Sequence, residues 1–167
     1  NSDFRMAARG SDGADILKSL FEQADLAFAG ARDFALVLGR PELAEPGHEE
    51  EAVAAAFDAF PHLARIAHTG RRQHGVDRHD LDAHLHTRDG IHSAGPCTLQ
   101  HIVDRIGTGD AFAAGILDGL LRGAAPGEVA AFGLAAAAMK HSIAGDFSPA
   151  SRAQIEAVMD GALDVKR

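Results

Sequence analysis

The sequence predicts an α/β fold, in which buried strands alternate with the helices that cover them. Two short apolar runs, at residues 25–29 and 63–67, are typical of buried strands. Neighbouring segments carry their apolar residues at helical spacing instead. The chain has 167 residues, of which 46% are apolar and 24% charged, so it is long and apolar enough for one globular domain with a sizeable core.

The first half of the chain contains clear helix boundary signals. Ser11 and Asp12 are typical N-caps, and apolar residues at positions 16, 17, 20 and 21 follow them on one face. Gly39 and Pro41 end a second helix, and Pro61 ends a third that starts with the glutamates at 49–51. We therefore expect a first helix after the caps at 11 and 12 and two more over 32–38 and 49–60. Strands are expected over 25–29 and 63–67, and a polar link over 42–48.

Residues 70–98 differ from the rest because they contain few large apolar residues and many Arg, Asp and His. Val76, residues 84–86 and Ile91 indicate short strands with little coverage, and turns are expected at 77–80 and at 89–90. We interpret this region as a β-meander at the edge of the sheet, with its histidines in solvent. Residues 99–103 are expected to form a last strand that leads into a glycine turn.

The last third of the chain has the strongest helical pattern. Apolar residues from Phe112 to Leu121 recur at helical spacing up to Gly123. Pro126 suits the first turn of an alanine-rich helix that extends through Met139 and can lie close to a neighbour. A turn at 145–149 and a final helix capped by Ser151 complete the predicted elements.

The composition excludes several classes of function. A formal net charge of −8 argues against a nucleic-acid partner, which would need a basic stripe along the phosphates. No run of about 18 apolar residues is present, so we expect no membrane span. Cys97, the single cysteine, excludes an internal disulfide and fits a reducing cytoplasm. Because residue 1 is Asn, we interpret the chain as a fragment or a processed chain.

The glycine turn before Phe112 is the strongest candidate site. The N–H groups of Gly107, Thr108 and Gly109 would be free, because a helix N-terminus leaves about four donors unpaired, and they could surround an anion. The Asp110 carboxylate would repel a resting phosphate, but it suits a group that takes a proton from a hydroxyl attacking a phosphoryl group. Spacing alone favours the simpler interpretation, an acid stabilised by the helix dipole, so both stay open.

Residues 104–115, Asp-Arg-Ile-Gly-Thr-Gly-Asp-Ala-Phe-Ala-Ala-Gly, resemble the C-terminal signature of the ribokinase-like (PfkB) sugar kinases, D-x-x-G-A-G-D-x-F-x-x-G. They differ at Thr108, where the family usually has Ala. The resemblance implies a doubly wound, three-layer ribokinase-like sandwich, of which residues 1–167 would be the C-terminal, nucleotide-binding portion. It also implies that Asp110 contacts the substrate and is the catalytic base for its hydroxyl, and that Gly107, Thr108 and Gly109 form the anion hole for the transferred phosphoryl group.

Residues 138–147, Ala-Met-Lys-His-Ser-Ile-Ala-Gly-Asp-Phe, resemble the K-H-x-x-x-G-D-F stretch of bacterial 2-keto-3-deoxygluconate kinases within that family. In those kinases this region lies beside the adenine ring and helps to bind a monovalent cation. The resemblance therefore implies nucleotide contacts by Gly109, Gly133, Lys140 and Gly145, and a potassium ion near Asp104 and Gly145. From the residues alone, the stretch is an alanine helix ending in a turn, and this interpretation also stays open.

Three further positions follow from the same resemblance. Gly30 and Asp33 stand where the family usually has an N-x-x-E motif, which implies that Asp33 contacts Mg²⁺ through water, whereas an ordinary helix-start acid is the alternative. Thr69 and Gly70 would follow the strand at 63–67, near the nucleotide phosphates. Arg5 would help to hold the substrate.

The activity that the resemblance implies is ATP-dependent phosphorylation of a hydroxyl group of a small sugar or sugar acid, most specifically 2-keto-3-deoxygluconate to its 6-phosphate. ATP, Mg²⁺ and a potassium ion would be the cofactors. Fructose or ribose as substrate, and an inactive nucleotide-binding fragment that needs a partner half, stay open. Because family members are about twice as long, we expect the sugar-binding half and its lid to be absent. The exposed half-sheet would then form a homo-oligomer or pair with another chain.

Overall fold

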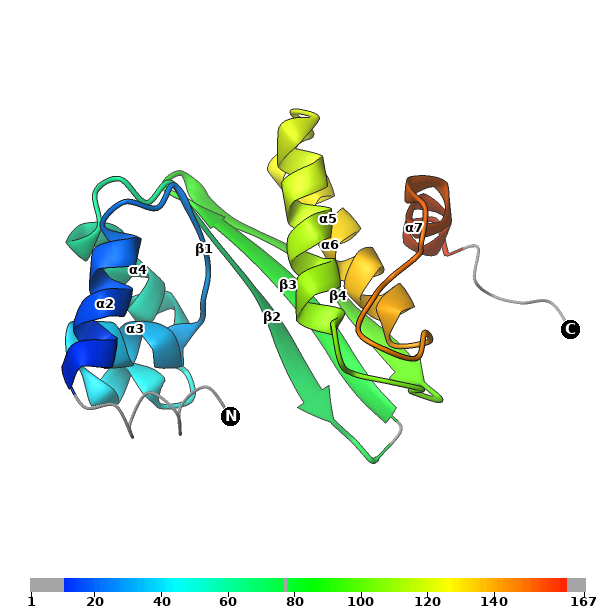
Figure 1. Cartoon of the computed structure of the whole chain (residues 1–167), viewed down its shortest axis with the longest axis horizontal. Coiled ribbons are helices and arrows are strands. Elements are labelled where there is room, and N and C mark those ends of the chain that lie inside the picture. Colours follow the sequence, from blue (N-terminus) through cyan, green and yellow to red (C-terminus); the bar gives the residue numbers. More distant parts are fainter. Residues whose placement is uncertain (1–10, 77, 162–167) are drawn as a thin grey trace, which may run out of the picture. The chain divides into compact units, whose positions relative to one another are not determined.

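The computed structural model describes residues 11–76 and 78–161, and Figure 1 shows their helices and strands. The elements are α2 (Ser11–Phe21), β1 (Leu26–Phe28), α3 (Ala31–Leu38), the 3₁₀ helix η1 (Pro41–Ala44), α4 (Glu49–Ala59), β2 (Arg65–Gln73), β3 (Arg78–Thr87), β4 (Gly90–Gln100), α5 (Thr108–Leu121), α6 (Pro126–Lys140) and α7 (Arg152–Met159). They confirm the predicted α/β fold and most of its element positions.

The described strands form one sheet in the order β1-β2-β3-β4. β1 pairs with β2 in parallel, with Leu26 opposite Arg65. The chain divides into two compact units, and each is described by itself. One unit takes its residues from the chain up to His68 and from His86–Gly90, and the other from Thr69–Leu85 and from Ile91 onward. Both β2 and β3 therefore contribute residues to both units.

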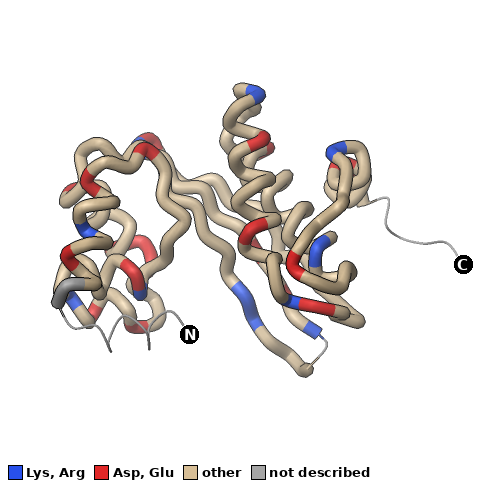
Figure 2. The backbone as a smooth tube through the Cα atoms, in the orientation of Figure 1, with Lys and Arg blue, Asp and Glu red and all other residues tan. Residues whose placement is uncertain are grey.

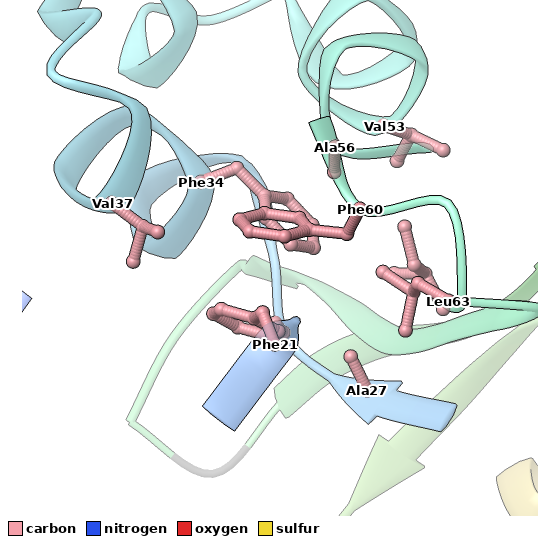
Figure 3. Packing of buried hydrophobic residues seen from close by; sticks show 10 residues of the cluster. Phe21, Ala27, Phe34, Val37, Val53, Ala56, Phe60 and Leu63 are labelled. Carbon is pink, nitrogen blue, oxygen red and sulfur yellow. The ribbon is translucent and has the colours of Figure 1, made fainter. Parts of the chain in front are cut away.

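The core of the first unit is aromatic. The Phe21 ring of α2 contacts Phe34 of α3 and Phe60 after α4, and its centroid lies 5.4 and 5.5 Å from theirs. Leu63 and Ile66, which lead into and along β2, are fully buried in the same cluster. Figure 3 shows the three rings meeting over the start of the sheet. The apolar faces predicted for the first three helices thus converge on one core.

Arg88, in the turn between β3 and β4, completes this unit. One of its terminal nitrogens donates to the carbonyl oxygens of Phe57, Phe60 and Pro61, at 3.2, 3.1 and 2.9 Å. The guanidinium also lies over the Phe57 ring, 5.2 Å from its centroid. The last carbonyls of a helix have no partner within the helix, and Arg88 satisfies that of Phe57 in α4. The Phe60 carbonyl oxygen also accepts the Leu63 N–H, at 3.0 Å.

In the second unit, α5 and α6 pack along one another through small residues (Figure 1). A Cβ added at Gly115 of α5 would stand 2.9 Å from the Cα of Gly133 in α6. At Gly119 it would stand 3.1 Å from a methyl carbon of Val129. This confirms the expectation that the alanine-rich helix lies close to a neighbour.

The predicted β-meander is confirmed, but its strands are longer and better covered than expected. His79, Leu81, Ala83 and Leu85 alternate along one face of β3 and are all buried. The expectation that the histidines lie in solvent is wrong for His79 and His86, which are 1% and 6% exposed. The strand period of two explains His79, because it shares a face with Leu81 and Leu85.

Other boundaries differ as well. β3 begins at Arg78, inside the turn that we expected at 77–80. β4 ends at Gln100, and His101, with a φ of 57°, breaks the extended strand that we expected to continue to residue 103. The polar link after α3 contains η1, whose Leu43 is fully buried. One apolar side chain in a polar segment is thus enough to attach it to the core.

The charges are spread along the chain. The sequence has 24 acidic residues against 16 lysines and arginines, and Figure 2 shows both kinds in the helices of each unit. None of the helices in the described part of the chain is both long enough and apolar enough to cross a membrane.

Candidate active site

The glycine turn predicted from the sequence stands at the start of α5, in the second unit. Gly107 precedes the helix with a φ of 76°, a left-handed conformation that glycine adopts without steric cost. A Cβ added there would stand 2.0 Å from the carbonyl oxygen of Asp146, so only a glycine lets these two backbones meet. Asp110 lies in the first turn of α5 and is exposed.

Several backbone donors are open at this helix start. The N–H of Thr108 lies 3.4 Å from the carbonyl oxygen of Arg105, and the Thr108 hydroxyl donates to the same oxygen at 2.9 Å. Within the part of the chain that the structure describes, the N–H groups of Gly107, Gly109 and Asp110 have no acceptor. Open donors at the positive end of a helix suit an anion. The sequence predicted open N–H groups at Gly107, Thr108 and Gly109. In the structure the Thr108 N–H is partly occupied by the Arg105 carbonyl oxygen, and the Asp110 N–H is an additional open donor.

Asp104 joins two loops beside this turn. Its Oδ1 accepts a hydrogen bond from the Ile106 N–H at 3.0 Å, and its Oδ2 accepts one from the Gly145 N–H at 2.8 Å. These bonds, with that from Ile106 as the larger cause, hold the pKa of the Asp104 carboxyl below its usual value. The carbonyl oxygen of His141 accepts from the N–H groups of Val103 and Asp104 at 2.9 and 3.3 Å.

The end of α6 turns its polar side chains inward. Lys140 is fully buried, and its ammonium donates to the carbonyl oxygen of Ile143 at 2.8 Å. His141 is 5% exposed, and its Nδ1 lies 2.7 Å from the carbonyl oxygen of Ala137, so Nδ1 carries the proton and donates it. Burial is the main cause that lowers the pKa of His141, which keeps the imidazole neutral at pH 7. Gly145, with a φ of 85°, is exposed.

Two of the expected nucleotide contacts, Gly133 and Lys140, are buried. Gly133 is buried in α6, and a Cβ added there would stand 2.7 Å from the Ile116 side chain of α5. Lys140, with no exposed surface, binds its own chain instead of facing outward. Gly133 lets α5 approach closely, and nucleotide contacts at Gly133 and Lys140 stay predictions. Of Gly133, Lys140 and Gly145, it is Gly145 that is exposed to solvent.

Thr69 and Gly70 lie inside β2, which continues to Gln73, so the expectation that they follow a strand is wrong. Gly70 lies under the side chain of Asp82 in β3, since a Cβ added there would stand 2.0 Å from Asp82 Oδ1. That oxygen is buried without a hydrogen bond among the described residues, although His84 Nε2 lies 3.3 Å away. A phosphate contact at Thr69 and Gly70 stays a prediction.

Asp33 belongs to the first unit and caps its own helix. Its Oδ2 accepts the N–H of Gly30 at 2.9 Å, at the start of α3. This contact fits the helix-start interpretation, and the contact with Mg²⁺ stays a prediction. Arg5 lies outside the described residues. Among the residues that are described, no group of three or more His, Cys, Asp and Glu could hold a metal ion.

Sequence reasoning missed the buried neighbour of His141. His79 influences the pKa of His141, and both ring nitrogens of His79 are buried without a hydrogen-bond partner in the described part of the chain. The alternation of His79 with Leu81 and Ala83 would have found it, because residues two apart on a strand share a face. The contact between Gly107 and the Asp146 backbone had no sequence signal, since it joins two loops that are far apart along the chain.

Comparisons with known proteins give the following. The model of the pfkB family carbohydrate kinases matches residues 3–151. A 2-dehydro-3-deoxygalactonokinase of Haloferax volcanii is 30% identical over 155 residues, which cover 90% of this chain and 43% of that protein.

Two solved structures show the extent of the likeness. The 2-dehydro-3-deoxygluconokinase of Thermotoga maritima is 25% identical with a TM-score of 0.77, over 89% of this chain and 47% of that one. A structure described as a ribokinase II of E. coli, in complex with ATP and Mg²⁺, is 15% identical with a TM-score of 0.67, over 90% and 44%. These likenesses confirm the ribokinase-like fold. The chain spans less than half the length of each of these proteins.

Proposed function

Because the chain belongs to the pfkB family of carbohydrate kinases, we propose that it is the C-terminal, nucleotide-binding part of an enzyme that uses ATP to phosphorylate a hydroxyl group of a sugar or sugar acid. The observation that carries this proposal is the start of α5. There the exposed carboxylate of Asp110 stands in the same helical turn as the open N–H groups of Gly109 and Asp110. A proton acceptor beside anion donors is the pair of functions that phosphoryl transfer to a hydroxyl needs.

The two parts of the turn have separate tasks in this reaction. The carboxylate of Asp110 accepts the proton of the substrate hydroxyl, whose oxygen forms a bond to the terminal phosphorus of ATP. The bond from that phosphorus to the bridging oxygen breaks, and ADP leaves with its electrons. The open N–H groups and the helix dipole stabilise the negative charge of the transferred phosphoryl group. Mg²⁺, when bound, neutralises charge on the phosphates.

We propose a 2-dehydro-3-deoxy sugar acid as the substrate, with 2-keto-3-deoxygluconate first and its galactonate isomer second. Support comes from the names of two relatives, a 2-dehydro-3-deoxygalactonokinase at 30% identity and a 2-dehydro-3-deoxygluconokinase at 25%. The chain covers 43% and 47% of their lengths, so fructose and ribose belong in the same test.

The test combines turnover with binding. ADP release by the chain is measured with Mg-ATP and each of the four sugars, and Mg-ATP affinity is measured by calorimetry. Asp110→Asn is the matched variant, because it keeps the size and the helix start but removes the proton acceptor. We expect sugar-acid-dependent ADP release that falls about 10²–10⁴-fold in Asp110→Asn, with Mg-ATP affinity nearly unchanged.

Other results would change the assignment in defined ways. Equal loss of binding and turnover in Asp110→Asn would mean that Asp110 is a structural residue. Binding of Mg-ATP without turnover on any sugar would favour a nucleotide-binding part that needs a second chain. That candidate is kept because the chain covers less than half of its relatives. Absence of Mg-ATP binding would contradict the proposal.

A further inference from the structure

Two glycine-containing segments meet at the candidate site without an apolar anchor. They are residues 103–107, before α5, and residues 141–146, after α6. Val103, Ile106 and Phe147 are 61%, 65% and 75% exposed, and the other large apolar side chains in and next to the segments, Ile102 and Ile143, are half-buried. Gly107 and Gly145 both have positive φ angles, and glycine backbones have the most freedom to lose on folding. No large apolar side chain of either segment is fully buried, so hydrophobic burial alone does not explain why these segments stay together.

Hydrogen bonds to Asp104 do explain it. One carboxylate oxygen accepts the N–H of Ile106 within the first segment, and the other accepts the N–H of Gly145, 41 residues away in the second. A bond to an ionised carboxylate is roughly twice as strong as one between neutral groups. The carbonyl oxygen of His141 adds two bonds from the N–H groups of Val103 and Asp104.

This bridge controls the position of the segment that touches Gly107. Asp146 follows Gly145 directly, and its carbonyl oxygen lies where a Cβ on Gly107 would stand. Gly107 in turn starts α5 and accepts the Ala111 N–H at 2.9 Å. A change at Gly145 is thus passed by contact to the residue that orients the first turn of the helix.

We propose that Asp104 is a positioning residue, whose carboxylate holds residues 141–146 against Gly107 and thereby fixes the direction of the N–H groups of Gly109 and Asp110. This inference rests on the proposed function in one respect, which is the identity of the ligand that the N–H groups of Gly109 and Asp110 bind. It gives Asp104 a task other than the metal contact expected from the sequence, and the task requires both carboxylate oxygens at once.

The experiment uses the ¹⁵N-labelled chain and three variants. Asp104→Ala removes both acceptor oxygens, and Asp104→Asn keeps one of them. Asp160→Asn is the control, because it removes the same charge from an exposed residue of the same unit, at the end of α7. Amide resonances and hydrogen exchange are measured first without ligand. Mg-ATP is then titrated into each protein.

We expect faster exchange of the Ile106 and Gly145 amides in Asp104→Ala, together with shifted Gly107, Gly109 and Asp110 resonances. Mg-ATP affinity should fall at least about tenfold, which is 1.4 kcal/mol. Asp104→Asn should lie between Asp104→Ala and the unchanged chain, because one acceptor oxygen remains. Resonances of α7 should stay in place, which separates repositioning from general unfolding. If Asp104→Ala does not fold, the graded effect of Asp104→Asn carries the test.

The failure of this inference and that of the proposed function look different. Unshifted Gly109 and Asp110 resonances in a ligand-free Asp104 variant would overturn the positioning role, whatever Mg-ATP does. If instead those resonances shift in the variant but do not respond to Mg-ATP in the unchanged chain, the positioning role stands and the proposed nucleotide site fails. An effect of equal size in Asp160→Asn would also overturn the inference, since charge alone would then be the cause.

Discussion

Gly107 is the residue on which the candidate site depends most directly. Its φ of 76° is strained for any residue with a Cβ, and that Cβ would stand 2.0 Å from the Asp146 carbonyl oxygen. We expect Gly107→Ala to lower the free energy of unfolding by at least about 1–2 kcal/mol, because the left-handed conformation alone costs that much. Urea unfolding followed by circular dichroism measures the change.

Gly109→Ala is the matched control. Gly109 lies two residues further along, in the helix, and a Cβ added there would have no atom within 4 Å. Alanine is the better helix former, by up to about 1 kcal/mol, so this variant should be neutral or slightly more stable. Equal destabilisation by both substitutions would contradict the contact described between Gly107 and Asp146.

Sequence and structure agree best at single residues with local causes. The positive φ of Gly107, the helix-start place of Asp110 and the cap at Ser151 were all predictable, because each depends on its immediate neighbours. The bond between Asp104 and Gly145 and the burial of Lys140 were not, because each depends on segments brought together by folding. The packing of Gly133 against Ile116 failed to be predicted for the same reason.

The same distinction between local and long-range causes applies to the helices and strands. The helices were predicted nearly to the residue, since apolar spacing and Pro or Gly boundaries mark them directly. The meander was predicted as a region, but the coverage of β3 was not. In β3, polar residues alternate with His79, Leu81, Ala83 and Leu85. From the sequence alone, such a strand cannot be told from one that is exposed on both faces. Only the folded structure shows that the face with Leu81 and Leu85 is buried.

The link between α5 and α7 gives a prediction about pH at the element scale. Asp118 of α5 accepts hydrogen bonds from Arg152 of α7 and Arg122, and these two guanidinium groups, Arg152 first, hold the pKa of its carboxyl below the usual value. A carboxyl with a lowered pKa adds stability above the ordinary Asp range and loses it as the pH falls through its folded value. Asp118→Asn should therefore lower the melting temperature at pH 7 but hardly at pH 3.

Thermal melting of both proteins at the two pH values measures this effect. Its size at pH 7 should be about 0.5–1 kcal/mol, as for other partly exposed ion pairs. Asp160→Asn, at the end of α7, serves as the control for loss of a negative charge. A difference between Asp118→Asn and the unchanged chain that is as large at pH 3 as at pH 7 would contradict the assigned cause.

At the scale of the whole molecule, exposed apolar residues predict association. Ile16 and Leu20 are 62% and 60% exposed, and they stand four residues apart on one face of α2. We expect the chain to self-associate with rising concentration, because a second copy would remove this face from water. Sedimentation velocity over a hundredfold concentration range measures it, and Leu20→Glu should shift the chain toward the monomer.

The control for this prediction is Leu121→Glu, a change of the same kind at a residue that is 87% exposed at the end of α5. It should leave association unchanged, since the residue lies in the other compact unit. A monomer at every concentration would rule the prediction out.

The hydrogen bonds from Arg88 to the end of α4 also have a consequence for folding during synthesis on the ribosome. A ribosome finishes α4 first, yet Arg88, which donates to the carbonyl oxygens of Phe57 and Pro61, follows them only 31 and 27 residues later. Those intervening residues include Thr69–Leu85, which belong to the other unit. At usual rates of synthesis this interval lasts roughly 1–6 s. During that time water must satisfy the end of α4, and a nascent chain stalled before Arg88 would hold its first helices without their closing contact.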